Sequence, residues 1–156
     1  MHSFVMPQDY VKRVVARQGQ AHVCETFDGP STALVVVDMQ NYFMVEPYQA
    51  ACAVAQEIVP NVNRLAEAVR KAGGKVLWVQ NLAPWESEVS WSVAREMYGP
   101  DRAKKRWESM QRDAHGFQLW PGLDVRDGDE RVVKRRYSAF IQGSSNIANV
   151  LDDNRI

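Results

Sequence analysis

The sequence predicts an α/β fold, a parallel sheet flanked by helices, and two observations support this. Residues 35–37 are three valines in a row, and Asp38 follows them directly. An unbroken run of β-branched apolar residues is typical of a strand that is buried on both faces of a parallel sheet. A second apolar run lies at residues 75–80, after one helix-length segment. Strand, helix and strand together predict a right-handed βαβ unit.

The first 30 residues are predicted to form an extension that precedes the domain. Within this extension, Val11, Val14 and Val15 share one helical face, which predicts a short helix over residues 7–17. An Asp-Gly-Pro turn then leads into the first strand.

A helix is predicted between the two strands. An Ala-rich helical stretch begins at about Tyr48, and Pro60 suits the first turn of the main helix. Two glycines, Gly73 and Gly74, end that helix. Its buried face is predicted to consist of four apolar residues. These are Val62, Leu65, Ala66 and Val69.

Residues 82–121 differ in composition because they combine tryptophans with many charges. Two short helices are predicted here, near 86–97 and 101–113, with a break at Gly99. Trp85 and Trp91 are expected to pack in a core, an oligomer interface or a lid over the substrate.

A third strand is predicted at residues 131–134, and Ser145 is a suitable N-cap for a helix from Asn146 to about Asp152. A parallel sheet usually needs more than three strands to cover both of its faces. We therefore expect these residues to be the first part of a larger domain.

Composition excludes several classes of protein. The net charge is +0 and the pI is near 6.8, which argues against a nucleic-acid partner and against an acidic membrane surface. No apolar run has the length of a membrane span. Two cysteines are too few for a disulfide scaffold, so the expected location is the reducing cytoplasm.

Asp38 and Lys134 both lie at the carboxyl ends of predicted strands, the edge at which open α/β sheets bind ligands. If those strands are adjacent, the two side chains meet above the sheet. Such a pair can take a proton from a nucleophile and stabilise the resulting anion. A purely structural ion pair, or a solvated lysine, is the alternative.

Two segments resemble motifs of a known family, the isochorismatase-like or cysteine hydrolases. Residues 34–43, Leu-Val-Val-Val-Asp-Met-Gln-Asn-Tyr-Phe, resemble the opening motif of that family. Residues 134–140, Lys-Arg-Arg-Tyr-Ser-Ala-Phe, resemble its second motif. The resemblance covers residues 31–156, which we interpret as the N-terminal part of one domain.

The resemblance implies a Rossmann-like, three-layer α/β/α fold and an Asp-Lys-Cys catalytic triad. Asp38 matches the aspartate and Lys134 matches the lysine. The family's cysteine begins the helix after the next strand, a position that follows residue 156. Cys24 and Cys52 match no family position, and Cys52 is expected to be a small buried apolar residue.

The resemblance also implies a chemistry, the hydrolysis of a C–N bond in a small amide, ureido or carbamoyl compound. One alternative is a vinyl-ether hydrolase of the isochorismatase type, which needs no cysteine. Against it, those enzymes usually carry a histidine before the motif aspartate, and Val37 stands there. A second alternative is a binding or scaffold protein without catalysis.

Four further residues are candidates for substrate binding. Gln40 and Phe43 follow Asp38 and are expected to line the floor of a pocket, although Phe43 suits a core position equally well. Asn81 ends the second strand beside Gln80, and an amide there can bind a polar substrate or cap a loop. Tyr137 follows Lys134 and is expected either to reach the substrate or to pack at the sheet edge.

No metal or other cofactor is expected. The histidines, His2, His22 and His115, are scattered without ligand spacing. Nicotinamidases of this family carry an Asp-x-His metal motif after the second strand, where this chain has Asn-Leu-Ala instead. The expected partners are a small-molecule substrate and, by resemblance, further copies of the chain in a dimer or tetramer.

Overall fold

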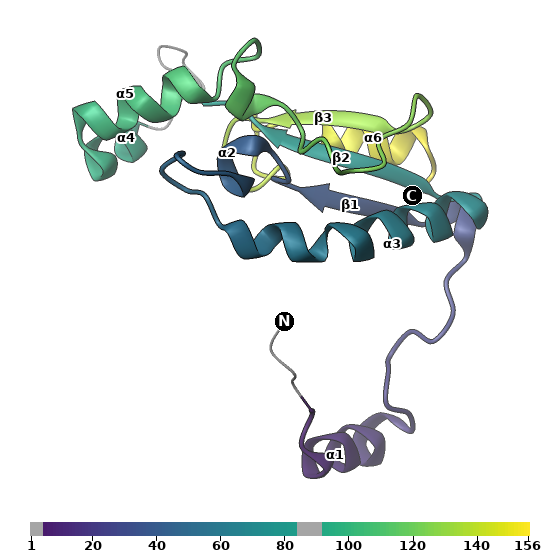
Figure 1. Cartoon of the computed structure of the whole chain (residues 1–156). Helices are drawn as coiled ribbons and strands as arrows, with labels where there is room; N and C mark the ends of the chain where they lie inside the picture. Colours follow the sequence, from purple (N-terminus) through teal and green to yellow (C-terminus); the bar gives the residue numbers. More distant parts are fainter. Residues whose placement is uncertain (1–4, 84–91) are drawn as a thin grey trace.

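Three parallel strands form the centre of the computed structural model, which describes residues 5–83 and 92–156 (Figure 1). These strands are β1 (Ala33–Val37), β2 (Lys75–Asn81) and β3 (Glu130–Lys134). β2 lies in the middle and pairs in parallel with both neighbours. The predicted α/β fold with a parallel sheet is therefore confirmed.

The register of the strands brings their carboxyl ends to one edge of the sheet. Val37 of β1 pairs with Val79 of β2, and Asn81 of β2 pairs with Lys134 of β3. Residues that follow these positions therefore gather at the edge where open α/β sheets bind ligands.

Two helices cover the two faces of the sheet, so that the described elements form three layers. The helices are α3 (Val59–Lys71) and α6 (Ile147–Asp153), and Figure 1 shows them on opposite faces. Each covers its own apolar cluster. The core under α3 includes Val36, Val59, Ala66, Val76 and Trp78. The core under α6 includes Leu77, Val79, Val132, Ala139 and Ile147.

The predicted start and end of α3 are confirmed, but one residue of its predicted buried face is not buried. Pro60 lies in the first turn, and Gly73 follows the helix with a left-handed φ of 84°. Leu65 is 52% exposed, whereas its neighbour Ala66 is fully buried. Successive helical residues point about 100° apart. The buried stripe is centred on Ala66, which turns Leu65 towards the outside.

The remaining elements match the sequence predictions in part. The helix predicted over residues 7–17 is present and stands apart from the sheet, with no buried residue (Figure 1). The predicted Ala-rich stretch is only a short 3₁₀ helix, and residues 84–91 lie outside the described part.

The described helices include none that is long and apolar enough to cross a membrane. The bounds are α1 Gln8–Gln18, η1 Gly29–Ser31, α2 Asn41–Met44, η2 Ala53–Ile58, α4 Ser92–Tyr98, α5 Pro100–Ser109 and η3 His115–Phe117.

Ser145, which the sequence predicted to be the N-cap of α6, stands one residue before the N-cap, Asn146, but still contacts the start of the helix. The hydroxyl of Ser145 accepts a hydrogen bond from the backbone N–H of Ile147 at 3.1 Å. This contact satisfies one of the N–H groups that a helix start leaves unpaired. The helix itself begins at Ile147, one residue later than predicted.

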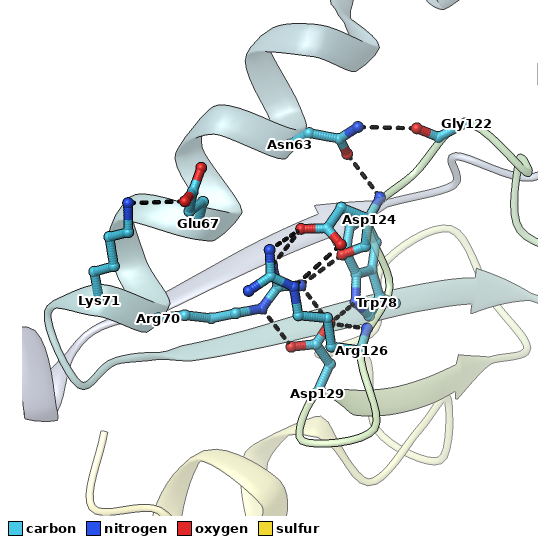
Figure 2. A network of polar contacts seen from close by, with 9 residues as sticks. All are labelled: Asn63, Glu67, Arg70, Lys71, Trp78, Gly122, Asp124, Arg126 and Asp129. Atoms are coloured by element: carbon cyan, nitrogen blue, oxygen red, sulfur yellow. Dashed lines mark hydrogen bonds and ion pairs between the residues drawn. The ribbon is translucent and has the colours of Figure 1, made fainter.

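A network of charges joins α3 to the segment before β3 (Figure 2). The guanidinium of Arg70 donates to both carboxylate oxygens of Asp129, at 2.8 and 2.6 Å, and to the carboxylate and the carbonyl of Asp124. The indole N–H of Trp78 in β2 donates to Asp129 as well, at 2.8 Å. The network therefore ties α3, β2 and this segment together.

Candidate active site

Asp38 is the residue at which the chain leaves β1. Its backbone N–H donates to the carbonyl of Val79 at 2.9 Å, which extends the pairing with β2. Its φ is 60°, a left-handed conformation that costs a non-glycine residue roughly 1–2 kcal/mol. The backbone therefore turns sharply at Asp38, at the carboxyl edge of the sheet.

Lys134 brings a positive charge to the same place from β3. Its Nζ lies 2.9 Å from Oδ2 of Asp38 and donates to the carbonyl of Tyr137 at 2.8 Å. The condition stated from sequence, that the two strands are adjacent, is wrong, because β2 lies between them. Neighbouring strands lie about 4.8 Å apart, so the pair spans roughly 10 Å, a gap that the long lysine side chain bridges.

The two oxygens of Asp38 have different surroundings. Oδ2 accepts the lysine ion pair, whereas Oδ1 is buried and has no hydrogen-bond partner among the described residues. Buried polar atoms without partners are rare in native proteins and cost free energy. Oδ1 is therefore a proton acceptor that the described part of the chain leaves unused.

Gln40 connects the end of β2 to the segment around η3. Its side chain is fully buried, and its Oε1 accepts from the backbone N–H of Asn81 at 2.6 Å. Its Nε2 donates to the carbonyls of Asn81 and Phe117, at 3.1 and 2.9 Å. Its amide therefore fixes two segments of backbone, at Asn81 and at Phe117, and a contact of Gln40 with substrate stays a prediction.

The other three candidates lie around the pair, and their contact with a substrate stays a prediction. Asn81 is buried, and its backbone is bound by Gln40. Phe43 is half-buried and packs edge-on against Tyr42, with ring centroids 5.1 Å apart. Tyr137 is 58% exposed.

The phenol of Tyr137 is joined to the α4–α5 helix pair. Its oxygen lies 3.1 Å from the phenol oxygen of Tyr98. This hydrogen bond and partial burial raise the pKa of Tyr137 above its ordinary value, against the opposing charge of Arg106. Tyr137 therefore links the segment after Lys134 to the helices outside the sheet.

The segment around η3 is a part of the site's frame that the sequence did not reveal. The carbonyl of Phe117 accepts from Gln80 at 2.8 Å as well as from Gln40. The amide of Asn41 donates to the carbonyl of His115 at 2.9 Å and lies 3.1 Å from its ring Nε2. These partners are so far apart in sequence that no local pattern indicates them.

The cysteines and histidines form no second centre in the described part. Cys24 and Cys52 are both exposed free thiols, so the expectation of a buried Cys52 is wrong. Cys52 lies at the entry to η2, which has no buried residue. Residues 5–83 and 92–156 contain no cluster of three or more metal-binding side chains. Trp85 and Trp91, proposed for packing or a lid, lie outside the described residues.

A comparison with protein families decides what kind of domain this is. A model of the isochorismatase domain matches residues 32–156, nearly all of the chain after its N-terminal extension. The chain belongs to the isochorismatase family. The resemblance expected from the two motifs is therefore confirmed.

Relatives in this family have been named as amidases, and one as inactive. The chain is 31% identical over 122 residues to a probable inactive nicotinamidase of Arabidopsis thaliana, covering 78% of this chain and 59% of the relative. It is 27% identical over 128 residues to the N-carbamoylsarcosine amidase of an Arthrobacter species, covering 82% and 47%. The chain thus spans about half the length of these relatives.

Solved structures of the isochorismatase family share the fold. A cysteine hydrolase from Pseudomonas syringae pv. phaseolicola 1448A superposes with a TM-score of 0.71 at 22% identity, covering 83% of this chain and 57% of that one. An N-carbamoylsarcosine amidase from Thermoplasma acidophilum gives a TM-score of 0.60 at 26% identity, covering 80% and 62%. The three-stranded sheet with its helices therefore matches a part of the fold of these two structures.

Proposed function

We propose that the protein is an amidohydrolase that cleaves a C–N bond in a small amide, ureido or carbamoyl compound. The observation that carries the proposal is the Asp38–Lys134 ion pair at the carboxyl edge, with one oxygen of Asp38 left unused. The names of its relatives, which include an N-carbamoylsarcosine amidase and a ureidoacrylate amidohydrolase, support this class of substrate.

In the proposed mechanism the nucleophile is a cysteine at a position after residue 156. Asp38 takes the proton of its thiol, and Lys134 stabilises the ionised state. The thiolate attacks the carbonyl carbon, and backbone N–H groups bind the oxyanion. The C–N bond breaks, and the nitrogen leaves with the proton that Asp38 held. Water then hydrolyses the thioester, which releases the acid and restores the thiol.

This proposal is tested by measuring the hydrolysis of a panel of substrates by the full polypeptide, meaning the polypeptide that includes the proposed cysteine. The panel contains carbamoyl, ureido and simple amide compounds, and release of ammonia or amine is measured. Asp38→Asn keeps the shape of the side chain but accepts no proton at neutral pH, so its turnover should fall to background. The control is Asp152→Asn, an exposed carboxylate on α6, which should leave turnover unchanged. Full activity of Asp38→Asn would refute the proposed role.

The alternative is a member of the family without catalysis, and the Arabidopsis relative named as probably inactive favours it. This alternative predicts that no compound of the panel is turned over and that substrate analogues do not slow thiol alkylation. The amidohydrolase predicts both turnover and protection of one thiol by a bound analogue.

A further inference from the structure

Arg106 is a positive charge that the proposed mechanism does not use. It lies on α5, in the helix pair that projects beyond the carboxyl ends of the strands (Figure 1). Its guanidinium lies over two tyrosine rings, 5.4 Å from the centroid of Tyr42 and 5.8 Å from that of Tyr98. The side chain is half-buried. Aromatic rings on two elements therefore hold this cation in place.

The two rings that contact this guanidinium are linked to the two segments that supply the ion pair. Tyr42 is almost fully buried and stands four residues after Asp38. On the other side, the phenol oxygen of Tyr98 lies 3.1 Å from that of Tyr137, whose carbonyl accepts from Lys134. Arg106 therefore contacts α2, which follows Asp38, and α4, which is hydrogen-bonded to the segment after Lys134.

In the part of the chain that the structure describes, no carboxylate forms an ion pair with Arg106. Within residues 5–83 and 92–156 its only contacts besides ordinary packing are the two ring faces. Ring faces attract a guanidinium but do not accept its planar N–H groups. A half-buried guanidinium without an acceptor suits a carboxylate, which it binds with two parallel hydrogen bonds.

We propose that Arg106 binds the carboxylate of the substrate. The substrate class is then an N-carbamoyl or ureido acid, with its C–N bond at the Asp38–Lys134 pair and its carboxylate towards α5. This inference rests on the proposed function, because it assigns the far end of the same substrate.

Arg102 is a matched control on the same helix. It also lies over the ring of Tyr98, at 5.9 Å, and it carries the same charge. However, it is exposed and lines a shallow hollow together with Gln49, Asp101 and Lys105. Arg102→Gln removes one positive charge from α5, as Arg106→Gln does. It leaves the contact between Arg106 and Tyr42 intact.

Isothermal titration of the full polypeptide tests the inference. All proteins carry Asp38→Asn to prevent turnover, and the ligands are N-carbamoylglycine and 3-ureidopropionate, each with its methyl ester. For at least one acid we expect binding about tenfold tighter than for its ester, as loss of a charge-assisted hydrogen bond predicts. Arg106→Gln should abolish this preference, Arg106→Lys should keep part of it, and Arg102→Gln should keep it in full.

The outcomes separate this inference from the proposed function. Three results would overturn the role of Arg106. The Asp38→Asn protein could bind acids and esters equally, the preference for the acid could survive Arg106→Gln, or Arg102→Gln could reduce that preference as much as Arg106→Gln does. Thermal unfolding of each variant shows whether it is folded. If Arg106→Gln is unfolded, the preference for acid over ester is measured in Arg106→Lys instead, and an undiminished preference there overturns the role of Arg106. The preference for the acid could depend on Arg106 although the wild type hydrolyses none of the compounds. That result would refute the proposed function and would still support a carboxylate-binding site at Arg106.

Discussion

Two ion pairs among the described residues, Lys134–Asp38 and Arg70–Asp129, each have one buried partner, and they differ in how completely their polar atoms are bonded. Both oxygens of the Asp129 carboxylate accept hydrogen bonds from Arg70. Oδ2 also accepts from the indole N–H of Trp78 and from the backbone N–H of Arg126 (Figure 2). The carboxylate of Asp38 receives Lys134 on one oxygen and leaves the other without a partner among the described residues.

The difference separates a structural ion pair from one that is suited to chemistry. A network whose members are all satisfied defines one geometry, and any reaction there would have to break several hydrogen bonds. An unused acceptor beside a buried cation is costly to the fold, but it can receive a proton without breaking any contact. The contrast therefore predicts opposite results for matched variants of the two cations.

The largest expected effect on activity is that of Lys134→Met. The substitution removes the cation from the site, and we expect turnover to fall by about 10²- to 10⁴-fold, the range found for proton-transfer groups. Stability should change by no more than about 1 kcal/mol, because Asp38, the partner left without its cation, is 30% exposed and can be hydrated in the variant. Steady-state kinetics and urea unfolding on one preparation check both expectations. Retained turnover would show that the pair is structural.

The same replacement at the other pair should give the opposite result. Arg70→Met leaves Asp129, which is 3% exposed, without its cation. Removing one partner of a buried pair costs about 3–5 kcal/mol, and we expect that loss in the free energy of unfolding. Turnover per folded molecule should be close to that of the wild type. A loss of less than about 1 kcal/mol, the value of an exposed pair, would contradict the structural role.

The sequence was sufficient to predict the fold class and the pair, because both depend on local patterns. Buried strands appear as apolar runs, and the residue after such a run lies at the carboxyl edge. That argument placed Asp38 and Lys134 together although it misjudged which strands are adjacent. The family motifs supported the same two residues.

The rest of the site could not be predicted, because it depends on contacts between distant segments. Gln40 joins residues that stand 41 and 77 positions away, and its sequence neighbours give no sign of either contact. The exposure of Leu65 and of Cys52 depends on which side of their elements faces the core. A helical pattern gives the width of a buried stripe better than its centre.

The charge network should also show itself in the pH dependence of stability. Burial acts to raise the pKa of Asp129, but hydrogen bonds from Arg70, Trp78 and the backbone of Arg126 outweigh it, so the pKa lies below the ordinary value. A carboxyl with a lowered folded pKa adds stability above its unfolded pKa, and this stability is lost as the pH falls through the folded pKa. The free energy of unfolding should therefore decrease below about pH 4.

Variants at Asp129 and at an exposed carboxylate separate this contribution from general acid unfolding. Urea unfolding is measured from pH 7 to pH 3 by tryptophan fluorescence. Asp129→Asn should be less stable at neutral pH and should lose less stability on acidification. The control is Asp153→Asn, an exposed carboxylate on α6, which should follow the wild type. Parallel curves for Asp129→Asn and the wild type would show that the network contributes nothing specific.

The smallest effect is expected from the two cysteines that the chain does contain. Cys24 and Cys52 are exposed, and neither contacts the Asp38–Lys134 pair through any hydrogen bond of the described residues. The double variant Cys24→Ser, Cys52→Ser should keep turnover within about twofold, since exposed substitutions away from a site change little. In the full polypeptide it should also stay sensitive to iodoacetamide, because the proposed nucleophile is a different thiol. If the double variant instead loses both its turnover and its sensitivity to iodoacetamide, one of these two thiols is the nucleophile. The unused oxygen of Asp38 would then have to receive its proton from within residues 1–156.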